Sequence, residues 1–157
     1  MNTDEQAIEI IEKNRRISLI GFIVTFTCWQ LGQIVTLNFG DSASPLVLGI
    51  FHFLNIAGSF GWVGFSYYLY KSIRLQKQHP QIKDQINDER ASLIRLRAMS
   101  FGFVYSTGAA GLIFGTSFLI DSFAVEFRLQ GTVVAQSIML IGLVSSWVAY
   151  LILDKEE

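Results

Sequence analysis

ISLIGFIVTFTCWQLGQIVTLNFG, residues 17–40, contains no Asp, Glu, Lys or Arg. This run is longer than the about 20 residues that an α-helix needs to cross a bilayer with a hydrocarbon core of about 30 Å. Three further runs have the same character: residues 42–70, 98–120 and 129–153. The pattern predicts four transmembrane helices.

The composition of the whole chain agrees with a membrane location. Of its 157 residues, 51% are hydrophobic and 16% are charged, and the mean hydropathy is +0.41. These values are typical of membrane proteins. A formal net charge of -1 gives no general attraction to nucleic acid, so no nucleic-acid partner is expected. A cleaved signal peptide is disfavoured, because the first apolar run is too long and an acidic leader precedes it.

We therefore expect an all-α fold, an integral membrane bundle of four transmembrane helices in two hairpins, with cytoplasmic amphipathic helical extensions. Ser44 and Pro45 are an N-cap and first-turn pair, which predicts the start of the second helix. At the N-terminus, Ala7, Ile8 and Ile11 share one face of an amphipathic helix. The expected parts of this single membrane domain are a cytoplasmic amphipathic segment 1–16, transmembrane helices 17–37, 45–70, 98–120 and 130–153, and a basic helical loop 71–97.

Basic residues near the ends of transmembrane helices stay in the cytoplasm. Here they collect on one side of the expected membrane, whereas the opposite loops carry only Arg128. Both termini are therefore expected in the cytoplasm. The residues on the basic side include Lys13, Arg15, Arg16, Lys71, Arg74, Lys77, Lys83, Arg90, Arg95 and Arg97.

The segment KQHPQIKDQINDERASLIRLRAMSFGF, residues 77–103, has a D-E-R triplet, then I-R, then a small residue before an apolar run. It resembles a segment shared by small uncharacterised prokaryotic membrane proteins with four helices. The matching positions are Asp88, Glu89, Arg90, Ile94, Arg95 and Ala98, and the segment is about a sixth of the chain. The resemblance implies a prokaryotic inner membrane and a four-helix topology, and no activity comes with it.

Five polar side chains lie within the apolar runs at similar expected depth in the outer half of the membrane. They are Gln30, Gln33, His52, Asn55 and Gln136. Because an amide facing lipid is costly, we expect these side chains to face one another. The cluster is either a structural hydrogen-bond network or a pocket for a quinone, a lipid head group or a pigment. Trp29 and Trp62, well inside their helices, favour a pocket.

No metal or cofactor site is expected. His79 is the only other histidine and belongs to the cytoplasmic side, so ligation of haem by two histidines of one chain is excluded. The sequence also contains no H-E-x-x-H or G-x-S-x-G motif and no carboxylate within an apolar run. We therefore expect no enzyme activity from this chain.

A second candidate group lies on the cytoplasmic side. Asp88 and Glu89 have no base three or four positions later, so they are available to pair with bases on other helices. The candidate partners are Arg74, Lys77, Arg15 and Arg16. This predicts an ionic clasp between hairpins or subunits. The alternative is a solvated face with arginines that reach the lipid head groups. The candidate interaction residues are Arg74, Asp88, Glu89, Arg90 and Arg95.

Small residues at regular spacing indicate where helices pack closely. They include Gly58, Gly61 and Gly64 in the second helix, Gly102, Ser106 and Ala110 in the third, and Gly142, Ser146 and Ala149 in the fourth. Such residues let helix backbones approach where lipid gives no hydrophobic drive for association.

Two functional hypotheses remain open from the sequence. The first is a non-catalytic accessory or scaffold subunit that acts in the bilayer through other membrane subunits or through homo-oligomers. The second is a binder or transporter of a small molecule, a quinone, lipid or pigment, that uses the outer polar cluster.

Overall fold

The computed structural model describes residues 3–40, 42–80, 89–122 and 131–155. Within these ranges the protein is all-α, with four long helices, each long and apolar enough to cross a membrane. This confirms the expected fold class. The helices are α1 (Thr3–Phe39), α2 (Pro45–Gln78), α4 (Glu89–Ser122) and α5 (Gly131–Leu153).

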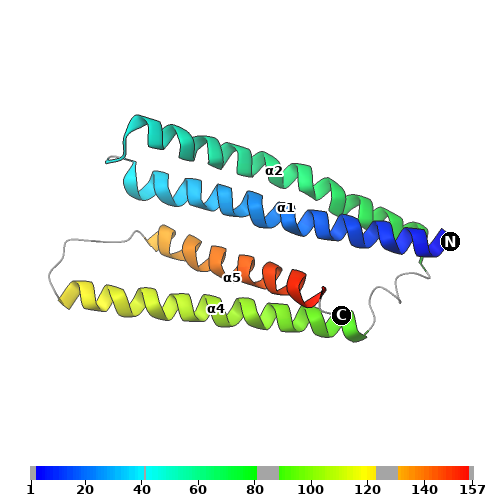
Figure 1. Ribbon diagram of the computed structural model, residues 1–157. Coiled ribbons are helices and arrows are strands. Elements are labelled where there is room, and N and C mark those ends of the chain that lie inside the picture. Colours follow the sequence, from blue (N-terminus) through cyan, green and yellow to red (C-terminus); the bar gives the residue numbers. More distant parts are fainter. Residues whose placement is uncertain (1–2, 41, 81–88, 123–130, 156–157) are drawn as a thin grey trace.

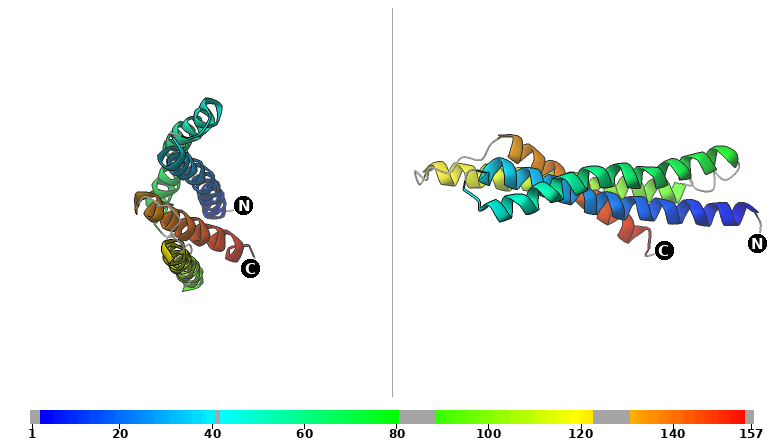
Figure 2. Two further views of the ribbon diagram at one scale, coloured as in Figure 1. Left: turned by 90° about the vertical axis from the view of Figure 1, so that its left-hand side faces the viewer. Right: turned by 90° about the horizontal axis from the view of Figure 1, so that it is seen from above.

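The helices form two antiparallel hairpins, α1–α2 and α4–α5, which meet mainly through α1 and α5 (Figure 1). The principal packing order is therefore α2, α1, α5, α4. Seen end-on, each hairpin stands as a separate pair (Figure 2). The start of α1 and the end of α5 lie toward the same end of the molecule. Because this end carries Arg15, Arg16 and Arg95, we name it the basic end.

Helix α1 is much longer than a membrane is thick. Its 37 residues span about 55 Å, whereas the 23 residues of α5 span about 35 Å. The N-terminal extension is thus a continuation of the first membrane helix. Its expected apolar face is buried at Ala7 and Ile11, while Ile8 is half-buried.

Both ends of α2 follow from local sequence. The Ser44 hydroxyl accepts a hydrogen bond from the Val47 amide at 3.5 Å, and Pro45 occupies the first turn, as the sequence predicted. At the other end, Pro80 disfavours helical geometry at the preceding residue. His79 accordingly leaves the helix with φ -126° and ψ 73°.

Hydroxyl groups inside the apolar helices bond to carbonyl groups of their own helix. Thr25 donates to Gly21 O at 2.7 Å, Ser59 to Asn55 O at 2.8 Å and Ser66 to Trp62 O at 2.7 Å. Such bonds satisfy a hydroxyl without a partner from another helix. These hydroxyls therefore do not mark a polar path across the membrane.

Within the first hairpin, glycines bring the two backbones together. A Cβ at Gly58 would lie 2.6 Å from both Thr25 O and Trp29 N, and one at Gly32 would lie 2.7 Å from Phe51 O. These distances leave no room for a side chain. Of the three glycines expected to pack in α2, Gly58 and Gly61 do so against α1, whereas a Cβ at Gly64 would meet no other atom within 4 Å.

The second hairpin uses the same device. A Cβ at Gly102 would lie 2.6 Å from Gly142 O and 2.8 Å from Ser146 Cβ. In return, a Cβ at Gly142 would lie 3.0 Å from Ser106 Cβ. The expected small-residue packing of α4 against α5 is confirmed at these positions.

Candidate functional site: the cavity between the hairpins

A cavity of about 620 Å³ lies between the two hairpins, and all four helices line it. Its volume falls within the range of about 300–1,000 Å³ that is usual for small-molecule sites. The lining residues come from α1 (Ile11, Arg15, Ser18, Leu19, Phe22), α2 (Trp62, Leu69, Ser72, Ile73, Gln76), α4 (Arg95, Ala98, Met99) and α5 (Ser146, Trp147, Tyr150).

Aromatic rings close the deep end of the cavity. The Phe22 and Trp62 rings stack with centroids 4.9 Å apart, and the Trp62 and Trp147 centroids are 6.3 Å apart. Phe26, only 3% exposed, touches both tryptophans edge-on at 5.8 and 5.7 Å. These are the separations at which aromatic pairs attract each other. The rings join α1, α2 and α5 into one apolar floor.

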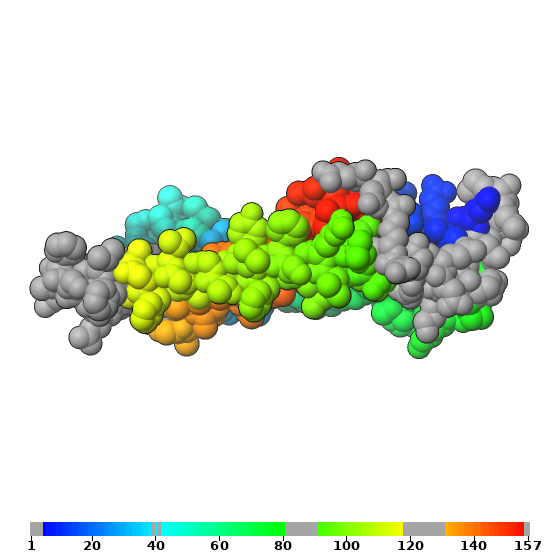
Figure 3. Space-filling model, turned by 90° about the horizontal axis from the view of Figure 1, so that it is seen from below, coloured from blue at the N-terminus to red at the C-terminus, as the bar shows by residue number. Residues whose placement is uncertain are grey.

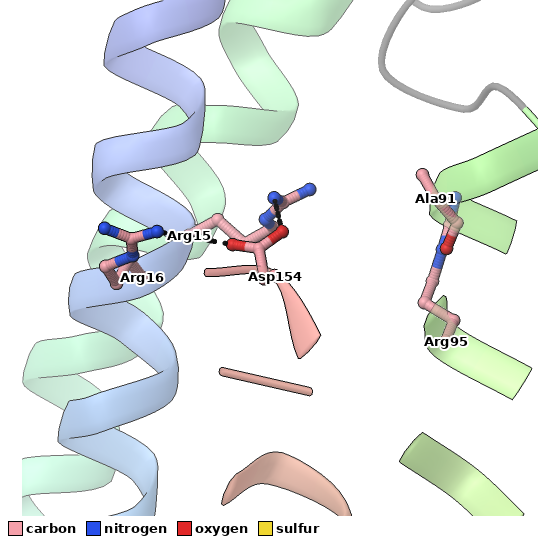
Figure 4. A network of polar contacts seen from close by, with 5 residues as sticks. All are labelled: Arg15, Arg16, Ala91, Arg95 and Asp154. Atoms are coloured by element: carbon pink, nitrogen blue, oxygen red, sulfur yellow. Dashed lines mark hydrogen bonds and ion pairs between the residues drawn. The ribbon is translucent and has the colours of Figure 1, made fainter. Parts of the chain in front are cut away.

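The mouth of the cavity lies at the basic end and is polar. Arg15 Nη2 donates to Asp154 Oδ1 at 2.9 Å, and Arg16 Nη2 lies 3.6 Å from Asp154 Oδ2 (Figure 4). The Arg15 guanidinium also lies over the Tyr150 ring, 5.4 Å from its centroid. Asp154 follows α5 directly, so this clasp ties the two hairpins together.

Arg95 reaches the mouth from α4. Its Nε donates to Ala91 O, one turn earlier, at 3.1 Å (Figure 4). The side chain is exposed and lines the cavity. Two arginines from different hairpins, Arg15 and Arg95, thus border the same opening.

The cavity is elongated along the helices. On α1 its lining runs from Ile11 to Phe22, about 16 Å at 1.5 Å per residue. Part of its wall is open to the surroundings, because Leu69 and Ile73 of α2 are 42% and 45% exposed and Met99 of α4 is 69% exposed. The site therefore combines a cationic mouth with a long apolar interior.

At the opposite end of the molecule, the structure brings together two of the five residues of the expected polar cluster. Gln136 Nε2 donates to Gln33 Oε1 at 2.6 Å, which links α5 to α1. Gln33 follows Arg15 by 18 residues and Gln136 precedes Asp154 by 18 residues. This tie and the clasp thus lie about 27 Å apart, at the two ends of one interface.

The other three residues of that cluster have different surroundings. Gln30 is 1% exposed, and its Oε1 lacks a hydrogen-bond partner among the described residues. Asn55 packs beside Gly32 in the first hairpin. His52 is exposed, and no hydrogen bond joins it to another described residue. None of the five residues lines the cavity between the hairpins.

The expected cytoplasmic group lies largely outside the described residues. This is so for Asp88 and for the side chains of Glu89 and Arg90, while Arg74 is exposed on α2. The clasp expected at Asp88 and Glu89 therefore stays a prediction. A different ionic clasp joins the hairpins, between Arg15, Arg16 and Asp154. One signal for it was present in the sequence: Asp154 is the first charge after the fourth apolar run, at the same membrane boundary as Arg15 and Arg16.

Among the residues that the structure describes, no three His, Cys, Asp or Glu side chains lie close enough to hold a metal ion. The single cysteine, Cys28, is a half-buried free thiol. No family model, curated protein or solved structure matches the chain. The cavity and its mouth are therefore the features on which a function can be based.

Proposed function

We propose that this chain is a non-catalytic, multi-pass membrane protein that binds a membrane-soluble molecule between its two hairpins. The observation that carries the proposal is the cavity of about 620 Å³ lined by all four helices. Its apolar floor suits a hydrocarbon or ring system, and its mouth suits a polar head. Such a combination of apolar walls and a few convergent polar groups is typical of small-molecule sites.

We place the binding site in the cavity at the basic end and not at the outer polar cluster. The Gln33–Gln136 hydrogen bond at the outer end is a contact between helices, of the kind that contributes about 0.6 kcal/mol in membrane proteins. At the basic end, the same two helices border the cavity. The contact between Gln33 and Gln136 thus supports a structural role for the outer amides. The cavity at the basic end supports binding of a small molecule.

A second candidate function is that of an accessory or scaffold subunit, which the outer face of α4 favours. Exposed apolar side chains cover this helix, which runs across the front of the molecule in the view from below (Figure 3). At Gly108, Gly111 and Gly115, a Cβ would meet no other atom within 4 Å. Helices with glycines four residues apart associate readily in membranes. Gel filtration of wild type and of Gly111→Leu tests this role. If the chain associates through this face of α4, the variant should elute as a smaller assembly than wild type.

The proposed location is a prokaryotic inner membrane, with the basic end in the cytoplasm. This orientation follows from the uneven distribution of Lys and Arg. Cysteine labels in a Cys28→Ser background test it in intact cells. Labels at Ser42 and Ser122 should react from outside and a label at Gln85 should not, whereas the reverse pattern contradicts the orientation.

Native mass spectrometry of protein released from a mild detergent tests binding. We expect wild type to retain a small molecule and Met99→Trp, which fills the cavity, to lose it. Leu96→Trp is the matched control, because Leu96 is 66% exposed on the same helix and does not line the cavity. Equal retention of the small molecule by all three proteins would show that it does not bind in the cavity.

A further inference from the structure

Resting on the proposed function, we infer that the cavity binds an amphiphile with an anionic head, a phosphate or a carboxylate, and that Asp154 competes with this head for Arg15. The head lies at the mouth between Arg15 and Arg95. The hydrocarbon chain extends toward the aromatic floor.

The charge at the mouth selects the sign of the head. Among the described residues that line the cavity, the charged ones are Arg15 and Arg95, and Asp154 pairs with Arg15 and Arg16 beside the mouth. Guanidinium groups bind phosphate and carboxylate through paired hydrogen bonds, which are stronger than bonds between neutral groups. A cationic head would meet like charges.

The shape of the cavity selects the rest of the molecule. From the mouth, an apolar wall of Leu19, Leu69 and Ile73 leads to the ring of Phe22. From Arg15 to Phe22 this path is about 10 Å long, and it is partly open along α2 and α4. Each methylene group moved from water into such surroundings contributes about 0.8 kcal/mol, so a chain adds binding that a free anion lacks.

Asp154 holds the place of the anion when the site is empty. Its Oδ1 lies 2.9 Å from Arg15 Nη2, which is the separation of a charge-assisted hydrogen bond. An incoming head that bonds Arg15 must replace this carboxylate or share the guanidinium with it. Loss of the Asp154 charge should therefore strengthen anion binding, the opposite of what a purely structural clasp predicts.

The experiment measures the intrinsic tryptophan fluorescence of the full chain in a neutral detergent, because Trp62 and Trp147 form the cavity floor. The protein is titrated separately with dodecyl phosphate, dodecanoate, dodecanol and inorganic phosphate. We expect both anionic amphiphiles to bind, dodecanol to bind about tenfold more weakly, and inorganic phosphate to have no effect. The ratio of the first two affinities identifies the preferred head.

Three variants assign the roles of the charges. Arg95→Gln should weaken dodecyl phosphate binding about tenfold, whereas Arg97→Gln, an exposed arginine of α4 outside the cavity, should not. Asp154→Asn should tighten binding severalfold. Thermal unfolding of each variant confirms that it is folded, and Arg95→Gln tests the head group independently of the clasp.

The outcomes separate this inference from the proposed function. If dodecanol binds as tightly as dodecyl phosphate, and native mass spectrometry shows that Met99→Trp retains neither, the cavity is a binding site but the anionic head is wrong. If native mass spectrometry shows that Met99→Trp retains every amphiphile as well as wild type does, or that wild type retains none, the proposed function itself fails. If inorganic phosphate binds as tightly as dodecyl phosphate, the ligand need not be an amphiphile and that part of the inference is wrong. If Asp154→Asn binds dodecyl phosphate more weakly than wild type does, Asp154 does not compete with the head for Arg15.

Discussion

The interfaces within the hairpins and the interface between them are built on different principles. Within each hairpin, glycines bring backbone against backbone, as at Gly58 beside Thr25 and at Gly102 beside Gly142. Between the hairpins, α1 meets α5 through large rings and two polar ties, and a cavity remains. Backbone contacts have one possible geometry, whereas long side chains can adjust. The hairpins should therefore act as rigid units and the joint between them as the adaptable part.

The largest effect is expected from breaking a backbone seam. In Gly58→Ala, the new methyl group would lie 2.6 Å from two backbone atoms of α1, so the helices must separate. We expect the free energy of unfolding in detergent to fall by about 3 kcal/mol. Gly64→Ala is the control, because its site is open and alanine favours helix. Equal stability of the two variants would show that the first hairpin does not pack at Gly58.

A smaller effect is expected from the aromatic part of the joint. Trp147→Ala removes ring contacts to Phe22, Phe26 and Trp62, each of which contributes about 0.5–1.5 kcal/mol. The free energy of separating the two hairpins should fall by about 2 kcal/mol, while the two helices within each hairpin remain paired. Energy transfer between two labels on one hairpin measures pairing within it. Energy transfer between labels on different hairpins measures their separation. Tyr105→Ala, which loses a stacked partner within α4 alone, should not change the transfer across the hairpins.

The clasp should contribute less than the rings. The Arg15 and Asp154 side chains are 27% and 19% exposed, so water and salt weaken their attraction. A double-mutant cycle with Arg15→Gln and Asp154→Asn should give a coupling of about 0.5–1 kcal/mol. The same cycle at about 1 M salt should give a smaller coupling. A coupling that does not depend on salt would contradict this description of the mouth.

The smallest effect is expected at the opposite end of the joint. Gln136→Leu removes the hydrogen bond to Gln33, which should lower the free energy of unfolding by about 0.6 kcal/mol. His52→Leu should change it by less than the error of a chemical denaturation curve, because His52 is exposed and has no hydrogen bond within the described part of the chain. If His52→Leu is the more harmful change, the polar cluster expected from the sequence extends to α2 after all.

The fold was accessible from the sequence because its signals are local. Charge-free runs specify the spans, Ser44 and Pro45 specify the start of α2, and small residues such as Gly102 mark the seams within hairpins. The depth of each polar residue in the membrane also follows from its position along its helix. This explains why Gln33 and Gln136 were correctly placed near each other. Rotation of a helix about its axis was not readable, so His52 was assigned to the interior although it faces outward.

The cavity could not be read from the sequence in the same way. It depends on which hairpin helices meet, and no residue pattern states that α1 packs on α5. Without that contact, Trp62 and Trp147 are aromatic residues on separate helices, and Asp154 is an ordinary charge at a membrane boundary. The bases Arg15 and Arg16 were recognised as candidate partners in a clasp, but Asp154 was not recognised as an acid that pairs with them.

Distance measurements between paired spin labels test the two kinds of interface most directly. In a Cys28→Ser background, one pair joins the hairpins, at Tyr70 and Leu96, and one lies within the first hairpin, at Ile20 and Val63; all four side chains are exposed. On addition of dodecyl phosphate, the distribution between hairpins should shift and narrow, while the distribution within the hairpin stays unchanged. Equal changes in both pairs, or no change between the hairpins, would contradict rigid hairpins joined at an adaptable binding site.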